Sequence, residues 1–475
     1  MEERSKSLIK NTIILSFGNF LTKGIMFFMT PLFTRWISQS DYGVFDLILT
    51  YISLIIPIIT LESSEAVFRF LADKKPTNNS YRVIVTNSLL INLFGIVLCS
   101  MIGIVLGVVF NNFYFFCLIL LLSIFEGLNT YLNMLVRGLK KIDIYTISNI
   151  SFCIFMVISV TFFVKIINLD LNGMFIGYFF AYFLNVIFIS LIVKPYKFID
   201  FSVLSKKEIK SMLEYSIPLI PTVISWWIIL VSDRTIVSIF LGTSVTAILA
   251  IANKIPNLCQ TIFNVFHFSW QQNAIETKND VDKKEYYNLI FNKMIKTLSS
   301  IVILIMAFDF IIFYILFDER YFLAYYQAPI LMISIIFSMM SQFIGGIYIA
   351  DMNSKKNGYT ILFASIVNLV VHLMLIKFLG LYAASISTLI SYILLFFVRY
   401  KDIKTSVRLH IDKENIIVFL IILYFAIGIF INNIYMNVFN LILSILFCYF
   451  FNKIELHTMF CSLLNYKKGR FLKRW

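Results

Sequence analysis

The 475-residue sequence contains little charge, only four histidines and no grouped cysteines. Asp, Glu, Lys and Arg make up 14% of the residues, whereas a soluble chain is typically about one quarter charged. The six cysteines are scattered, and no CxxC, HExxH or GxxxxGK pattern occurs. These absences argue against a disulfide framework, a zinc site and a phosphate-binding loop. We therefore expect no metal, no cofactor and no enzymatic activity.

Long apolar runs fill most of the chain, which is 60% hydrophobic and contains 50 Phe. A run of about 20 apolar residues is long enough to cross a bilayer as a helix. We therefore predict an all-α, polytopic membrane protein with about 14 transmembrane helices. The expected spans are 11–34, 43–68, 83–110, 113–136, 145–167, 171–193, 213–241, 245–271, 293–317, 324–350, 358–379, 381–399, 415–433 and 437–452.

Lysine and arginine alternate between the two sides of these spans. Of the 40 Lys and Arg residues, 33 fall in the segments on the side of the amino terminus and four on the other side. This asymmetry follows the positive-inside rule and predicts that both termini are cytoplasmic. It also accounts for the net charge of +14 without nucleic acid as a partner. The outer loops are too short for a domain, and the longer inner loops at 194–212 and 272–292 are expected to form surface helices.

The sequence also indicates an internal repeat. Residues 37–44 and 241–248 occupy the same place, the outer turn between the first two spans of a six-span half. Two such halves would be related by an axis along the membrane normal, which is a common transporter plan. The predicted division is an N-lobe at 1–194, a cytoplasmic linker at 195–212, a C-lobe at 213–400, and two further spans with a basic tail at 401–475.

Three cations lie inside the predicted spans: Lys23, Arg234 and Lys254. A charge in the middle of a bilayer is costly and usually marks a pathway or has a partner. Because a lysine in a low-dielectric cavity can bind a phosphate as a point charge, we interpret the three as candidate substrate-binding residues. The alternative is that they form structural ion pairs with acids of the bundle.

Acidic residues within the spans suggest a gate and an ion site. Glu62, Glu65 and Arg69 have the spacing of one helix face, near the cytoplasmic end of the second span, and could pair across lobes as a gate; the alternative is a neutralised helix end. Glu126 and Asp309 are solitary acids that could couple transport to a proton or sodium gradient. Their alternative is pairing with a cation such as Lys23.

Two further features of the spans have structural interpretations. Asp46, near the outer end of the second span, is interpreted as structural. Pro31, Pro57 and Pro256 fall inside spans, where proline frees a backbone carbonyl and bends the helix. The bends would suit a moving transporter, and static kinks are the alternative.

The opening segment SLIKNTIILSFGNFLTKGIMFFMTPLFTRWISQSDYGVFDLI resembles the bacterial Wzx-type polysaccharide flippases of the multidrug/oligosaccharidyl-lipid/polysaccharide exporter superfamily. The matching features are the basic amphipathic start, the apolar helix that ends in Arg35, and the turn Asp41-Tyr42-Gly43. SIPLIPT at 216–222 is similar to the entry of that family's seventh span.

This resemblance implies two six-helix lobes around a central cavity. It implies that an undecaprenyl-diphosphate-linked oligosaccharide repeat unit, as in O-antigen or capsule synthesis, moves to the outer leaflet of the bacterial cytoplasmic membrane when the lobes rock. Cavity cations on the first and eighth spans would contact the diphosphate, and Lys23 and Lys254 match those positions by span and depth. Glycosyltransferases and a polysaccharide polymerase are the implied partners. A lipid II flippase and a multidrug/cation antiporter remain alternatives, while a membrane polymerase or ligase fits the short outer loops poorly.

Overall fold

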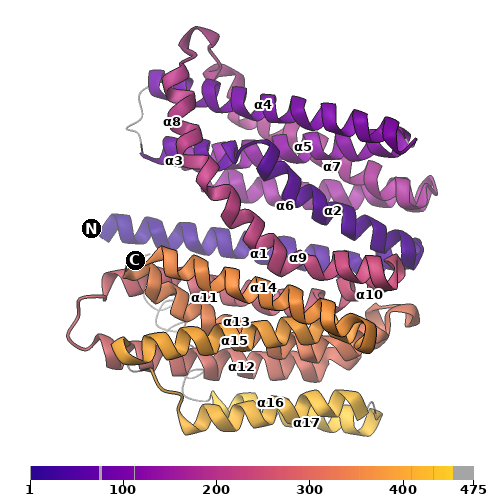
Figure 1. Cartoon of the computed structure of the whole chain (residues 1–475), viewed down its shortest axis with the longest axis vertical. Helices are drawn as coiled ribbons and strands as arrows, with labels where there is room; N and C mark the ends of the chain where they lie inside the picture. Colours follow the sequence, from indigo (N-terminus) through magenta and orange to yellow (C-terminus); the bar gives the residue numbers. More distant parts are fainter. Residues whose placement is uncertain are drawn as a thin grey trace, which may run out of the picture. The chain divides into compact units, whose positions relative to one another are not determined.

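The computed structural model describes residues 2–73, 78–111, 113–351, 353–407, 409–431 and 433–452. Every regular element within these ranges is a helix, which confirms the predicted all-α class (Figure 1). Within the same ranges, 11 helices are long and apolar enough to cross a membrane. The protein is therefore a multi-pass helical membrane protein. The predicted basic tail, from residue 453 onward, lies outside the described residues.

The chain forms two compact units, Met1–Ala250 and Ile251–Trp475. The predicted four-part division into lobes, linker and appended spans remains a prediction. The elements that begin in the first unit are α1 (Glu2–Trp36), α2 (Gln39–Ile59), α3 (Ser63–Asp73), α4 (Asn78–Val109), α5 (Phe113–Gly138), α6 (Ile142–Val160), the π-helix η1 (Thr161–Ile166), α7 (Asp170–Val193), the short 3-10 helices η2 (Pro195–Phe198) and η3 (Phe201–Val203), α8 (Lys206–Ser216), η4 (Ile217–Leu219), α9 (Ile220–Leu241) and α10 (Thr243–Ala252).

The centre of the first unit is a bundle in which α5 packs against α4 and α7, and α6 packs against α7 and α1 (Figure 1). A core of buried aliphatic residues joins α3, α4, α5 and α7 at one end of this bundle. Met212 of α8 also belongs to this core and is fully buried. The amphipathic helix α8 is therefore seated on the bundle, as expected of a surface helix in the linker.

The predicted second span is not one continuous helix. It divides into α2 and α3, because Leu61 and Glu62 have left-handed backbone angles, with φ of 52° and 54°. Pro57 precedes the break, and its carbonyl accepts a hydrogen bond of 2.9 Å from the Glu62 amide. The break packs tightly on α4 at Gly95, where a Cβ would lie 2.5 Å from the Ile59 carbonyl oxygen. Pro57 and the close approach at Gly95 thus mark a bend at this point.

Two other boundaries also differ from the predicted ones. Asp41-Tyr42-Gly43 is not a turn but the start of α2, whose N-cap Ser38 accepts a hydrogen bond from the Asp41 amide. The predicted eighth span divides at Asn253 into α10 and α11 (Lys254–Glu276), with Pro256 in the first turn of α11. A proline there costs little, because the first amides of a helix have no intrahelical partner.

The second unit is centred on α13 (Leu323–Ala350), which packs against α11, α12 and α15. The remaining elements of this unit are α12 (Lys283–Leu316), η5 (Glu319–Tyr321), α14 (Ser354–Leu379), α15 (Tyr382–Val407), α16 (Lys413–Ile431) and α17 (Ile434–Phe451). The separate surface helix expected in the loop 272–292 does not form in this fully described stretch, since α11 and α12 themselves extend into that loop and leave only 277–282 between them.

A buried arginine on α15, Arg399, forms hydrogen bonds with α13 and α14 of the second unit. The predicted span 381–399 ends at Arg399, but α15 continues past it and the side chain is 1% exposed. Its guanidinium donates hydrogen bonds to the carbonyl of Ser341 on α13 and to the carbonyl and side chain of Asn357 on α14. Gly345 leaves room for it, since a Cβ there would lie 2.8 Å from the Arg399 Nη1.

Candidate functional site

The two lysines predicted to bind substrate lie in different units. Lys23 is on α1 with an exposed side chain, near Cys153 of α6, whose Sγ contacts the Thr22 carbonyl at 3.9 Å. Lys254 is the first residue of α11 and is half-buried. Their common role in one cavity remains a prediction.

The third predicted cation, Arg234, forms an ion pair with Asp46. The Arg234 Nε lies 2.8 Å from the Asp46 Oδ2, and the side chains are only 19% and 15% exposed. The approach is an ion pair and not an aligned hydrogen bond, since neither atom has a hydrogen-bond partner among the described residues. The Arg234 Nη1 also lies 3.4 Å from the Thr50 Oγ1. The pair joins α2 to α9, which the sequence interpretation assigns to different halves.

Further polar contacts continue along the same two helices. The Trp227 indole donates to the Thr50 carbonyl at 3.1 Å, and the Tyr51 hydroxyl donates to the Thr235 hydroxyl at 3.0 Å. The rings of Tyr51 and Trp227 lie 6.0 Å apart. Both hydrogen bonds are only partly buried, so water could replace these contacts if the helices separated.

The two segments that correspond in the sequence repeat, 37–44 and 241–248, contact each other directly. The Ser40 and Thr243 hydroxyls lie 2.7 Å apart. Gly43 meets the backbone of α10 so closely that a Cβ would lie 1.9 Å from the Thr243 carbonyl oxygen. Gly242 separates α9 from α10 and has φ of 90°. Glycine adopts such a positive φ readily, which allows the chain to turn at this residue.

We call these contacts the polar seam. The polar seam consists of Ser40, Gly43, Asp46, Thr50 and Tyr51 on α2 with Trp227, Arg234, Thr235 and Thr243 on α9 and α10. Ser40, Gly43, Asp46 and Thr50 recur every three to four positions, which places them on one face of α2, and Tyr51 follows Thr50. A seam built from hydroxyls and one ion pair is specific in register.

The predicted gate residues do not all lie within one helix. Glu62 lies in the break before α3 and is buried, whereas Glu65 and Arg69 follow on α3, with Arg69 exposed. The Glu62 carbonyl accepts a hydrogen bond of 3.0 Å from the Glu65 amide, and the common face of the three residues stays a prediction. A gating role for the three remains a prediction.

The two predicted ion-coupling acids are enclosed by protein. Asp309, on α12, is 0% exposed, and both of its carboxylate oxygens lack a hydrogen-bond partner among the described residues. Glu126, on α5, lies beside Tyr182 of α7, and its Oε2 is likewise buried without a partner in the described part of the chain. An ionised carboxylate without partners is costly in such surroundings. A role of the two acids in ion coupling remains a prediction.

Sequence reasoning missed most of the polar seam. It noted Asp46 and Arg234 separately, interpreting the first as structural and the second as a candidate for substrate binding. Serine, threonine and tyrosine at 40, 50 and 51 on one face of α2 were an available signal. Their partners on α9 could not be found from local spacing.

Comparisons with known proteins agree with this architecture. A family model described as "Polysaccharide biosynthesis protein" matches residues 8–271. No curated protein matches the sequence. Among solved structures, the chain is similar to the lipid II flippase MurJ in an inward closed conformation, with a TM-score of 0.65 and 15% identity over 97% of this chain and 100% of that chain.

Transporters of the MATE family are also similar. An inward-facing multidrug resistance MATE transporter of the MOP superfamily has a TM-score of 0.65 and 13% identity over 83% of this chain and 94% of that one. A point mutant of the Vibrio cholerae MATE transporter VcmN has a TM-score of 0.58 and 12% identity over 86% of this chain and 98% of that one. At these identities the likeness establishes the fold.

Proposed function

Because the chain belongs to the polysaccharide biosynthesis protein family, whose model matches residues 8–271, we propose that it is a flippase for a lipid-linked oligosaccharide. The substrate is an undecaprenyl-diphosphate-linked repeat unit of O-antigen, capsule or a related polysaccharide. It moves from the inner to the outer leaflet of the bacterial cytoplasmic membrane by alternating access. Glycosyltransferases supply it on the inner side, where both termini of the chain lie, and a polymerase consumes it outside. The family match carries the proposal, and the helical fold shared with transporters supports it.

In this proposal the three intramembrane cations have two different roles. Lys23, whose side chain is exposed on α1, and Lys254, at the break before α11, bind the diphosphate as point charges. Arg234 instead pairs with Asp46 in the polar seam. The seam holds α2 against α9 and α10 at the outer side and must open before the substrate can leave. Glu62, Glu65 and Arg69 serve the corresponding inner side.

Asp309 is the favoured coupling residue, with Glu126 as the second. A proton can bind to the Asp309 carboxylate without any further ligand, whereas a sodium ion needs several oxygen atoms around it. In this proposal we take the driving gradient to be a proton gradient.

The test is transport by the purified full-length protein in vesicles. A fluorescent undecaprenyl-diphosphate oligosaccharide is placed in the leaflet that faces the cytoplasmic side of the protein, and its arrival in the other leaflet is detected by an impermeant quencher. We expect Lys23→Ala to reduce the rate at least tenfold. The matched control is Lys165→Ala, which removes the same charge from an exposed position on η1 and should leave the rate unchanged.

Substrate choice separates the alternatives in the same vesicles. Movement of lipid II without movement of the oligosaccharide lipid would instead identify a lipid II flippase. Export of a cationic dye in exchange for protons, with neither lipid moved, would identify a multidrug antiporter. Either result would refute the proposed substrate.

A further inference from the structure

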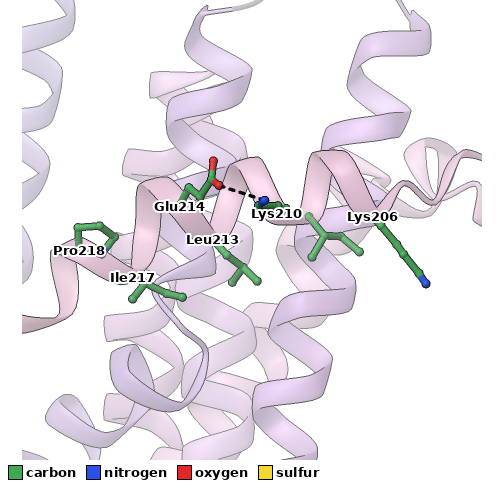
Figure 2. A pocket seen from close by; sticks show the side chains of 7 residues that line it. Lys206, Lys210, Leu213, Glu214, Ile217 and Pro218 are labelled. Carbon is green, nitrogen blue, oxygen red and sulfur yellow. Dashed lines mark ion pairs between the residues drawn. The ribbon is translucent and has the colours of Figure 1, made fainter.

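A groove runs along the exposed face of α8 and the turn that follows it (Figure 2). Its volume is about 400 Å³, and the middle and far end of its lining are apolar, with Leu213, Ile217 and Pro218. Lys206 and Lys210 lie at its beginning, one helical turn apart. The groove therefore has a cationic end and an apolar end. These two ends are complementary to the anionic headgroup and the apolar acyl chains of an acidic phospholipid.

The groove is held in place by the packing of the opposite face of α8. Met212 and Ser216 are fully buried against the first unit. The segment before α8 is fixed by Asn87 of α4, whose side chain accepts a hydrogen bond from the Ser205 amide at 3.0 Å and donates to the Val203 carbonyl at 3.3 Å. A preformed site of this kind spends little free energy on ordering when it binds a ligand.

One acidic residue also lines the groove. Glu214 lies 3.8 Å from the Lys210 Nζ, and the two side chains are 67% and 79% exposed. An exposed ion pair of this kind contributes little, so a phosphate could displace Glu214 from Lys210. Lys206 has no acidic partner within the described residues. The rim of the groove thus remains positive.

The segment around α8 has the composition of a membrane interface. Tyr196 and Phe201 are 60% and 70% exposed, and Ile217 at the groove is 46% exposed. These apolar side chains stand beside exposed lysines, and the segment connects two helices of a membrane-spanning chain. Apolar groups together with lysines are typical of segments that lie at the level of lipid headgroups.

We propose that the α8 groove binds an acidic phospholipid of the surrounding bilayer. Lys206 and Lys210 contact its phosphate and headgroup, and Leu213, Ile217 and Pro218 cover the first carbons of an acyl chain. The charge of the rim selects an anionic lipid over a zwitterionic one, while the apolar end distinguishes a lipid from a free phosphate. The site requires only that the chain resides in a membrane and does not depend on the proposed flippase activity.

The test uses the full-length protein in vesicles of equal parts phosphatidylcholine and phosphatidylglycerol, with a trace of photoactivatable phosphatidylglycerol. Covalent labelling is mapped to residues 206–218 by digestion and mass spectrometry. We expect Lys206→Gln and Lys210→Gln each to lower labelling about fivefold, corresponding to ~1 kcal/mol per lysine near an anionic surface. Lys207→Gln is the matched control, because this exposed lysine is on the same helix outside the groove.

Three outcomes would overturn the proposal. The first is equal labelling of 206–218 by photoactivatable phosphatidylcholine. The second is a loss in Lys207→Gln as large as that in Lys206→Gln, which would indicate only a general effect of charge. The third is full competition by inorganic phosphate, which would identify the groove as a site for free anions.

Discussion

Replacing Gly43 by alanine should force the polar seam apart. The new Cβ would lie 1.9 Å from the carbonyl oxygen of Thr243, 2.7 Å from its carbonyl carbon and 3.2 Å from the Ala247 amide nitrogen. All three are backbone atoms, so no side-chain rotation relieves the clash. Since carbon and oxygen normally approach no closer than about 3.3 Å, α2 and α10 must separate by roughly 1 Å or more.

The size of the effect follows from this displacement. The Ser40–Thr243 hydroxyl contact, now 2.7 Å, would lengthen beyond hydrogen-bond range. Overpacking typically costs about 1 to 3 kcal/mol, while replacing a helical glycine by alanine gains about 1 kcal/mol. Gly24→Ala is the matched control, because it has the same gain in helix propensity and nothing lies within 4 Å of its Cβ. The difference between the two variants isolates the clash.

The assay is the rate of disulfide formation between cysteines placed at 40 and 243, in a chain without its native cysteines. A loss of about 1 to 3 kcal/mol lowers the ratio of closed to open seam at least about fivefold. Gly43→Ala should therefore crosslink more slowly than Gly24→Ala, by about fivefold or more where the open state is already populated. Equal crosslinking rates in the two variants, at equal membrane abundance, would refute the close approach of α2 and α10.

Two further predictions concern charged groups. Asp46→Asn should lower thermal stability more than the double variant Asp46→Asn/Arg234→Gln, because the single change leaves a largely buried arginine unpaired. A double-mutant cycle should give a coupling of about 1 to 3 kcal/mol between the two residues. Additive losses of stability would show that the pair is not formed. Asp309→Asn should preserve or raise the unfolding temperature, since it replaces a buried carboxylate without a hydrogen-bond partner among the described residues. The same change should abolish transport driven by a proton gradient. Normal proton-driven transport in this variant would exclude Asp309 as the coupling residue.

The sequence predicts the helices well because hydropathy and chain length determine them directly. The fourth predicted span, 113–136, corresponds to α5 (Phe113–Gly138), and the sixth, 171–193, to α7 (Asp170–Val193). The break at Leu61 and Glu62 escaped prediction, since left-handed backbone angles at leucine and glutamate leave no signature in composition. The helix α15 extends beyond its apolar run, so Arg399 marked only the end of the predicted span 381–399, and its burial was not predicted.

The candidate site was only partly predictable for a different reason. Intramembrane charges such as Asp309 and Arg234 are visible in any sequence, because they are rare in apolar spans. The partner of such a charge depends on tertiary packing between segments far apart in the chain. Asp46 and Arg234 could therefore be noted singly, but their pairing required the structure.

The contact between Ser40 on α2 and Thr243 at the start of α10 bears on how such a chain could have originated. If the two halves descend from one duplicated segment, the ancestor would have been a symmetric dimer in which the segment 37–44 faced its own copy across a two-fold axis. At such an isologous interface every substitution occurs twice. After fusion the two copies became independent. In the repeat Gly43 corresponds to Ala247 and Thr243 to Gln39, so the close contact with Thr243 requires glycine at 43 alone, and the counterpart at 247 was then free to become alanine.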